Sequence, residues 1–152
     1  MKAFGDERIA GGETCLVVDL GGCTGMDSTF MGTLAGMAAR LSAQDGGVLQ
    51  IADSGVRNRR SLEDLGLDFL MEIDPPTAVW RGNVDSIRSE LKPPAPTGAP
   101  GQVQRAQHVL EAHQILSEAN DKNAREFSSV VTLLENELAE KEKRDAARTE
   151  KS

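Results

Sequence analysis

The chain has 152 residues, close to the roughly 150 of one domain, so we expect one domain with an appendage. Aromatic residues make up only 3% of the chain, which predicts a modest, aliphatic core. The 17 Lys and Arg against 24 Asp and Glu give a net charge of −7, which argues against direct nucleic-acid binding and against docking on an anionic membrane.

The first 91 residues alternate between strand and helix patterns. Short apolar runs bounded by glycine or proline predict strands, and apolar positions three and four apart predict helices. In chain order we expect a strand at 15–20, a helix opening at Asp27-Ser28 and ending at Gly46-Gly47, a strand at 48–52, a helix at 58–65, a strand at 69–73 and a helix at 80–91 that opens near Asn83. The residues before Gly11 resemble the end of a helix or a loop. This order predicts an α/β fold with a small sheet of parallel strands and packed helices, followed by a long C-terminal helix.

The rest of the chain changes composition twice. Residues 92–101 hold four of the six prolines and predict an extended, stiff linker. Residues 102–143 contain neither Gly nor Pro and predict a long amphipathic or coiled-coil helix, while the charged tail 144–152 is expected to fray or be disordered. We therefore expect a domain over 1–91, a linker and a helical appendage.

The long helix carries apolar residues three and four apart at both ends and polar residues between them. As a coiled-coil seam it would form a homo-oligomer through residues 102–143, with Asn120 fixing the register. Folding back onto the first domain is an equally good interpretation. A break at Asn120-Asp121 into a helical hairpin ranks third.

The cysteines and histidines form no recognisable metal or disulfide signature. Cys15 and Cys23 are too few for a disulfide framework or a zinc motif. His108 and His113 lie five residues apart and do not converge on a metal as an i, i+4 pair would. We interpret both histidines as solvated helix positions and predict neither a metal nor a cofactor.

The most informative stretch runs from Leu16 to Leu34: a strand, a glycine-bearing loop, Asp-Ser, and a helix. Its simplest interpretation is that Asp27 or Ser28 caps the helix. A phosphate-binding loop lacks support because no Lys precedes the Ser, and a serine nucleophile lacks support because there is no GxSxG and the histidines have no evident route back to Ser28. Within the helix, Gly32 and Gly36 lie one turn apart and predict a close approach to the sheet.

The run VVDL followed by MDSTFMGTLAGMAARL, and then Val56-Arg57, Leu62 and Leu65-Gly66-Leu67, resembles a STAS domain. More narrowly, it resembles the bacterial anti-sigma factor antagonists, whose strand ends in Asp-Leu and whose helix opens with Met-Asp-Ser. The resemblance covers roughly residues 1–91. The family begins with about two strands and a helix without a counterpart here, so the resemblance implies that the leading strands are missing or that the start lies upstream.

The resemblance implies a cytoplasmic, non-enzymatic partner-switching protein without a cofactor. Its partners would be an anti-sigma factor with serine-kinase activity, which phosphorylates Ser28, and a phosphatase that resets the switch. The implied partner-binding residues are Thr24, Gly25, Met26, Asp27, Ser28 and Thr29. Two other functions remain open: a structural adaptor that oligomerises through its C-terminal helix, and a small nucleotide-binding α/β protein.

Overall fold

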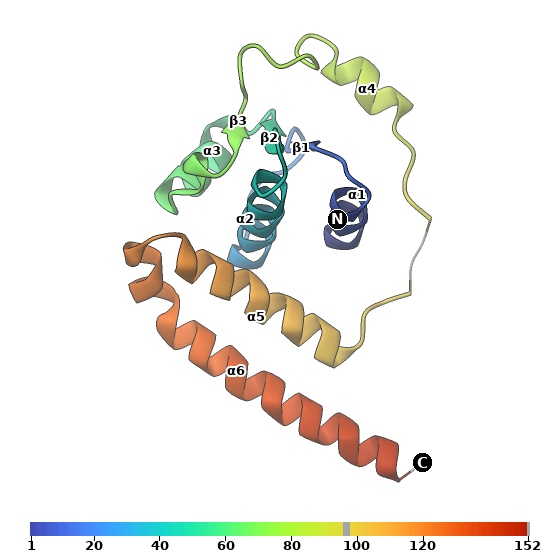
Figure 1. The fold of residues 1–152 in the computed structure, drawn as a ribbon, viewed down its shortest axis with the longest axis vertical. Coiled ribbons are helices and arrows are strands. Elements are labelled where there is room, and N and C mark those ends of the chain that lie inside the picture. The colour runs from blue at the N-terminus through green and yellow to red at the C-terminus, as the bar shows by residue number, and fades with distance from the viewer. Residues whose placement is uncertain (96–97, 152) are drawn as a thin grey trace.

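The computed structural model describes residues 1–95 and 98–151; positions 96–97 of the predicted linker and position 152 of the predicted tail lie outside these ranges. The chain forms a small parallel sheet with helices packed on it, followed by two long helices (Figure 1). In chain order the elements are α1 (Lys2–Ala10), β1 (Cys15–Asp19), α2 (Ser28–Ser42), β2 (Val48–Ala52), α3 (Gly55–Asp64), the 3-10 helix η1 (Leu67–Phe69), β3 (Glu72–Ile73), α4 (Val84–Glu90), α5 (Gln102–Ala119) and α6 (Asp121–Glu150).

The sheet has the order β1-β2-β3, and both pairs of strands are parallel. Its register places Val17 opposite Gln50, and Gln50 opposite Glu72. Parallel neighbours need a crossover connection, which α2 and α3 supply. The predicted α/β class with a small parallel sheet is therefore confirmed.

The two faces of the sheet have different surroundings. Leu49 and Ile51 are fully buried in a core that also includes buried side chains of α2 and α3. On the other face Val17 is 44% exposed, and Trp80 covers Gln50, donating from its indole Nε1 to the amide oxygen at 2.8 Å. The alternation follows from the two-residue period of a strand.

The third predicted strand is wrong over most of its length. Gly66 adopts a left-handed φ of 71°, after which Leu67–Phe69 form η1 and only Glu72–Ile73 pair with β2. Leu67 is buried whereas Phe69 is 89% exposed, so the apolar run does not follow a strand's inside–outside pattern.

Several predicted helix boundaries also shift. The first predicted helix ends at Ser42 rather than at Gly46-Gly47, because Gly47 closes a separate turn by donating its N–H to the carbonyl of Gln44. The helix expected at 80–91 is shorter, Val84–Glu90, and Asn83 is its N-cap residue as predicted. The residues before Gly11 form α1, which packs against α2.

The predicted long C-terminal helix is present as α6, but the single helix expected over 102–143 breaks at Asn120 into α5 and α6. This is the hairpin that ranked third, and through α5 it also folds back onto α2, as one of the two leading interpretations expected. Asn120 is extended, with φ −164° and ψ 169°, and its side chain caps α6 by accepting a hydrogen bond from the N–H of Asn123 at 2.8 Å. The predicted fraying of residues 144–151 is also wrong, since α6 continues to Glu150. Ion pairs one turn apart support this end of α6, among them Lys141–Glu137 at 2.6 Å.

The hairpin packs on the first part of the chain at two places. Along α2, Leu116 of α5 enters the common core and is fully buried. At the hairpin turn, Asn120 and Asn123 donate to the carbonyl of Leu65 at 3.1 and 2.9 Å, and Lys122 donates to the carbonyl of Asp64. These are carbonyls at the end of α3, which a helix leaves without intrahelical partners.

Gly32 and Gly36 face the hairpin and not the sheet. A Cβ on Gly32 would lie 2.2 Å from the carbonyl oxygen of Ala112 in α5. A Cβ on Gly36 would lie 2.8 Å from the Cδ1 of Ile115. The predicted close approach is therefore real, but the partner is α5. Among the described residues, we find no helix with both the length and the apolarity to cross a membrane.

Candidate functional site

Ser28 is the first residue of α2, at the carboxyl end of β1. Asp27 precedes it in extended geometry and caps the helix, its carboxylate accepting a hydrogen bond from the N–H of Phe30 at 2.8 Å. The capping role left open by the sequence therefore belongs to Asp27. Ser28 is half-buried, and its hydroxyl is not used as a cap.

The hydroxyl of Ser28 instead lies within hydrogen-bond distance of an imidazole in the C-terminal hairpin. The Oγ of Ser28 lies 2.8 Å from Nε2 of His113, and Nδ1 of His113 lies 2.7 Å from the carbonyl oxygen of Val109. A carbonyl only accepts, so Nδ1 carries a proton, and in the neutral ring Nε2 accepts the proton of Ser28. His113 is only 6% exposed, so the prediction of a solvated residue with no route to Ser28 is wrong.

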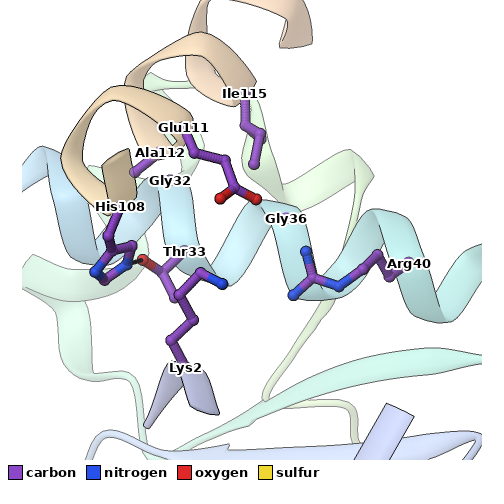
Figure 2. Close-up of a pocket in the computed structure, with 9 residues that line it drawn as sticks. All are labelled: Lys2, Gly32, Thr33, Gly36, Arg40, His108, Glu111, Ala112 and Ile115. Atoms are coloured by element: carbon purple, nitrogen blue, oxygen red, sulfur yellow. Dashed lines mark hydrogen bonds between the residues drawn. The ribbon is translucent and has the colours of Figure 1, made fainter. Parts of the chain in front are cut away.

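A second imidazole–hydroxyl pair lies along the same helix contact. The hydroxyl of Thr33 donates to the carbonyl of Thr29 at 2.8 Å and lies 2.8 Å from Nε2 of His108, so it accepts from that nitrogen (Figure 2). Ser28 and Thr33 lie five residues apart on α2, and their partners His113 and His108 lie five residues apart on α5 in the reverse order, because the two helices run in opposite directions. The prediction that His108 is a solvated position is therefore also wrong.

The cavity beside this second pair is small. Figure 2 shows it between α2, α5 and the start of α1, where Lys2, Thr33 and His108 line it together with Glu111 and Arg40. Its volume of about 10 Å³ is close to that of one water site and excludes an organic substrate. The α2–α5 contact is thus a packed interface.

A serine bonded to a histidine is also part of a hydrolase triad, but the other parts of the triad differ here. The group that orients His113 is the backbone carbonyl of Val109, not a carboxylate. The N–H of Phe30, at the helix start, is already bonded to Asp27. The arrangement fits a hydroxyl held by a neighbouring helix better than one presented to a substrate.

The other predicted partner-binding residues form the loop before α2. Thr24, Gly25 and Asp27 are exposed, whereas Met26 is half-buried and packs against the core. Thr29 is half-buried in the first turn of α2. These residues are consecutive in the chain, and the structure shows that they form the loop before α2 and its first turn.

The loop also has a basic neighbour that the sequence did not identify. The guanidinium carbon of Arg57, in α3, lies 3.8 Å from the position of a Cβ on Gly25. Arg57 is exposed, and within the described residues no hydrogen bond or ion pair of its side chain is seen. The side-chain amide of Asn58 fixes the loop by donating to the carbonyl of Cys23 at 2.8 Å.

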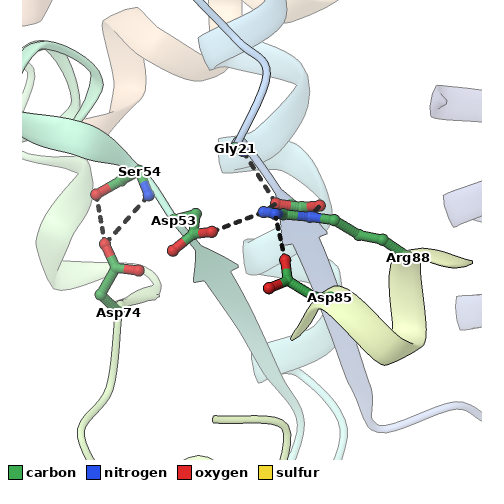
Figure 3. A network of polar contacts seen from close by, with 7 residues as sticks. Gly21, Asp53, Ser54, Asp74, Asp85 and Arg88 are labelled. Carbon is green, nitrogen blue, oxygen red and sulfur yellow. Dashed lines mark hydrogen bonds and ion pairs between the residues drawn. The ribbon is translucent and has the colours of Figure 1, made fainter. Parts of the chain in front are cut away.

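A second polar cluster lies at the carboxyl ends of the strands (Figure 3). Arg88 of α4 donates to Asp19 at 2.6 Å and to Asp53 at 2.7 Å. Asp74 accepts from both the N–H and the hydroxyl of Ser54. Asp53 and Asp74 have positive φ angles of 50° and 47°, which non-glycine residues adopt rarely.

The pKa shifts of this cluster follow from Arg88. Hydrogen bonds from Arg88 hold the pKa of Asp19 below its usual value, and the same pairing with Asp19 and Asp53 raises the pKa of Arg88. Because α4 buries none of its residues, these ion pairs are the main contact that the structure gives it. The described part of the chain contains no group of three or more His, Cys, Asp or Glu able to hold a metal ion.

Comparison with protein-family models, curated proteins and solved structures yields no match for this chain. A functional assignment therefore depends on the Asp-Ser motif and on the geometry around Ser28.

Proposed function

We propose that the chain is an anti-sigma factor antagonist: a cytoplasmic protein that binds an anti-sigma factor with serine-kinase activity and loses that partner when Ser28 is phosphorylated. The observation that carries the proposal is the position of Ser28. Its hydroxyl stands at the first residue of α2, while Asp27 takes the capping role. Phosphorylation of the serine would therefore leave the helix cap in place.

The reaction is a phosphoryl transfer in which the kinase supplies ATP. The Oγ of Ser28 forms a bond to the γ-phosphorus, the bond from that phosphorus to the oxygen bridging the β-phosphate breaks, and ADP leaves. The hydroxyl proton passes to a base on the kinase. A phosphatase later transfers the phosphoryl group to water and restores the serine.

Phosphorylation changes the charge of the docking surface. A phosphoserine adds about −1.5 to −2 charge next to the carboxylate of Asp27. Arg57 is the neighbouring cation of the loop, and it is exposed, so it compensates this charge only weakly. Burying the new charge against a partner would cost several kcal/mol, and about 3 kcal/mol already weakens binding by about a hundredfold.

The proposal is tested with the purified chain, ATP and candidate anti-sigma factor kinases from the same genome. Phosphopeptide mapping by mass spectrometry should place the phosphate on Ser28; Ser28→Ala should remain unmodified and Thr29→Ala should be modified normally. Titration calorimetry should then show binding of the kinase to the unmodified chain that is about a hundredfold weaker after phosphorylation. Phosphate at the wild-type level in Ser28→Ala, or equal affinity of both forms, would contradict the proposal.

A structural adaptor is the second candidate, and one observation favours it. On α6, Leu133 is 68% exposed and Val130 is 37% exposed, although both lie on a helix that otherwise pairs with α5. If this face joins copies of the chain, light scattering should report an oligomer that Leu133→Lys converts to a monomer. A monomer at all concentrations would exclude this adaptor function.

A further inference from the structure

We propose that the α5–α6 hairpin is an internal cover for Ser28, and that docking of the hairpin and a phosphate on Ser28 exclude each other. The inference rests on the proposed function, because it concerns the regulation of the same serine. It goes beyond that function by assigning a role to residues 102–150, which the resemblance to STAS domains does not include.

The space beyond the hydroxyl is already occupied. The Oγ of Ser28 is in hydrogen-bond contact with Nε2 of His113, so a phosphorus and three oxygens added there would meet the ring. Phe127 of α6 opposes a backward movement of the ring, because the two rings pack edge-to-face at a centroid distance of 5.9 Å. Its other nitrogen is tied to the carbonyl of Val109 at 2.7 Å.

Turning the phosphoserine away from the ring does not resolve the conflict. His113 is 6% exposed, so Nε2 would lose its partner in a place that water barely reaches. An unpaired buried acceptor is destabilising, as is a phosphate whose nearest charged neighbour in sequence is Asp27. The bond between Ser28 and His113 is therefore compatible only with the unmodified serine.

Helix α5 is packed tightly on α2 and carries no Lys or Arg beside Ser28 to compensate the phosphate. The carbonyl of Ala112 packs directly on α2 at Gly32, so the contact leaves no spare space between the helices for a phosphate. Besides its two imidazoles, α5 has one basic side chain, Arg105, at the far end of the helix, where it donates to the carbonyl of Pro100. The remaining adjustment is for the hairpin to leave the surface of α2.

Exclusion of this kind is reciprocal, because two ligands that compete for one state weaken each other equally. The docked hairpin should slow phosphorylation of Ser28, and phosphate on Ser28 should release the hairpin. Release uncovers the face of α2 around Gly32 and Gly36, while the linker keeps the hairpin attached. The hairpin thus competes, from within the same chain, with any partner that binds the face of α2 beginning at Ser28.

The test uses the full chain with phosphoserine installed at position 28 during translation, so that no kinase is needed. Amide hydrogen exchange measured by mass spectrometry should be at least tenfold faster in peptides of α5 than in the unmodified chain, while peptides of β2 keep their protection. Phosphoserine at Ser89, an exposed residue of α4, is the matched control and should leave α5 unchanged. Unchanged exchange in α5, an equal effect of the Ser89 control, or loss of protection in β2 as well would overturn the proposal.

A double-mutant cycle tests the cause. His113→Ala removes the ring that excludes the phosphate, so phosphoserine at position 28 should accelerate exchange in α5 much less in that background. An equally large acceleration would overturn the assigned contact. Because the phosphate is installed directly, a negative result here contradicts the cover alone, whereas failure of every kinase to modify Ser28 contradicts the proposed function.

Discussion

The glycines of α2 provide the sharpest test of how the hairpin is held. Replacing Gly32 by Ala adds a Cβ that would lie 2.2 Å from the carbonyl oxygen and 2.8 Å from the Cβ of Ala112. Ordinary contacts begin near 3.4 Å, so α5 would have to retreat by about 1 Å. Because the obstacle is backbone, no side-chain rotation relieves it.

The expected magnitude is the difference of two opposing effects. Gly→Ala inside a helix gains about 1 kcal/mol from backbone entropy, whereas overpacking a tight interface costs about 1–3 kcal/mol. For Gly32→Ala the obstacle is rigid, so we expect a net loss of about 1–2 kcal/mol and a fall in Tm of about 2–8 °C. For Gly36→Ala the obstacle is the flexible Cδ1 of Ile115, so we expect stability within about 1 kcal/mol of the wild type.

The assay is urea unfolding followed by circular dichroism, with hydrogen exchange of α5 as a second readout. Gly32→Ala should lower the midpoint and accelerate exchange in α5, and Gly36→Ala is the matched control one turn away. If Gly32→Ala proves as stable as Gly36→Ala, α5 does not pack on α2 at the distance described. The proposed cover over Ser28 would then lose its structural basis.

Three further variants test the cap, the hairpin turn and the acidic cluster. Asp27→Ala removes the cap of α2 and should destabilise the chain by about 1 kcal/mol in urea unfolding. Asn123→Asp replaces the fully buried donor to the carbonyl of Leu65 by a carboxylate, and should lower the free energy of unfolding by several kcal/mol at pH 7 and by less at pH 4. Arg88→Ala should accelerate hydrogen exchange in α4. Because Arg88 lowers the pKa of Asp19, the stabilisation from this ion pair is present above the unfolded pKa of about 3.9 and is lost as the pH falls through the folded pKa. The free energies of unfolding of Arg88→Ala and of the wild type should therefore differ at neutral pH and become equal in acid.

The elements with a strong local signal were predictable from the sequence. The strands at 15–20 and 48–52 are bounded by glycines and match β1 and β2 within one residue, and the Asp-Ser pair marks the start of α2. The third strand was not predictable from its apolar residues. Its run includes Phe69 and Leu70, which are exposed after the turn at Gly66, so apolar composition did not report burial there.

The sequence predicted Ser28 but not its partner, because His113 lies 85 positions further along the chain. The five-residue spacing of His108 and His113 does not suit a shared metal ion, but it matches two hydroxyls on another helix. Ser28 and Thr33 have the same five-residue spacing, and two helices packed in opposite directions bring equal spacings together. That match, together with Asn120 as a helix cap, was the available signal for a hairpin packed on α2.

A cover that responds to one phosphate must be held within a limited range of free energy. To be docked 99% of the time the hairpin needs about 2.7 kcal/mol, whereas docking by well over 10 kcal/mol would make it permanent. Burial of Leu116 contributes about 1.5–3 kcal/mol to docking, and each imidazole–hydroxyl bond contributes about 0.5–1.5 kcal/mol, in addition to the hydrogen bonds from the hairpin turn to the end of α3. Ordering the hairpin on α2 opposes these gains. Losing the Ser28–His113 bond and placing a charge beside it costs several kcal/mol, which is comparable to the about 2.7 kcal/mol that would keep the hairpin docked 99% of the time.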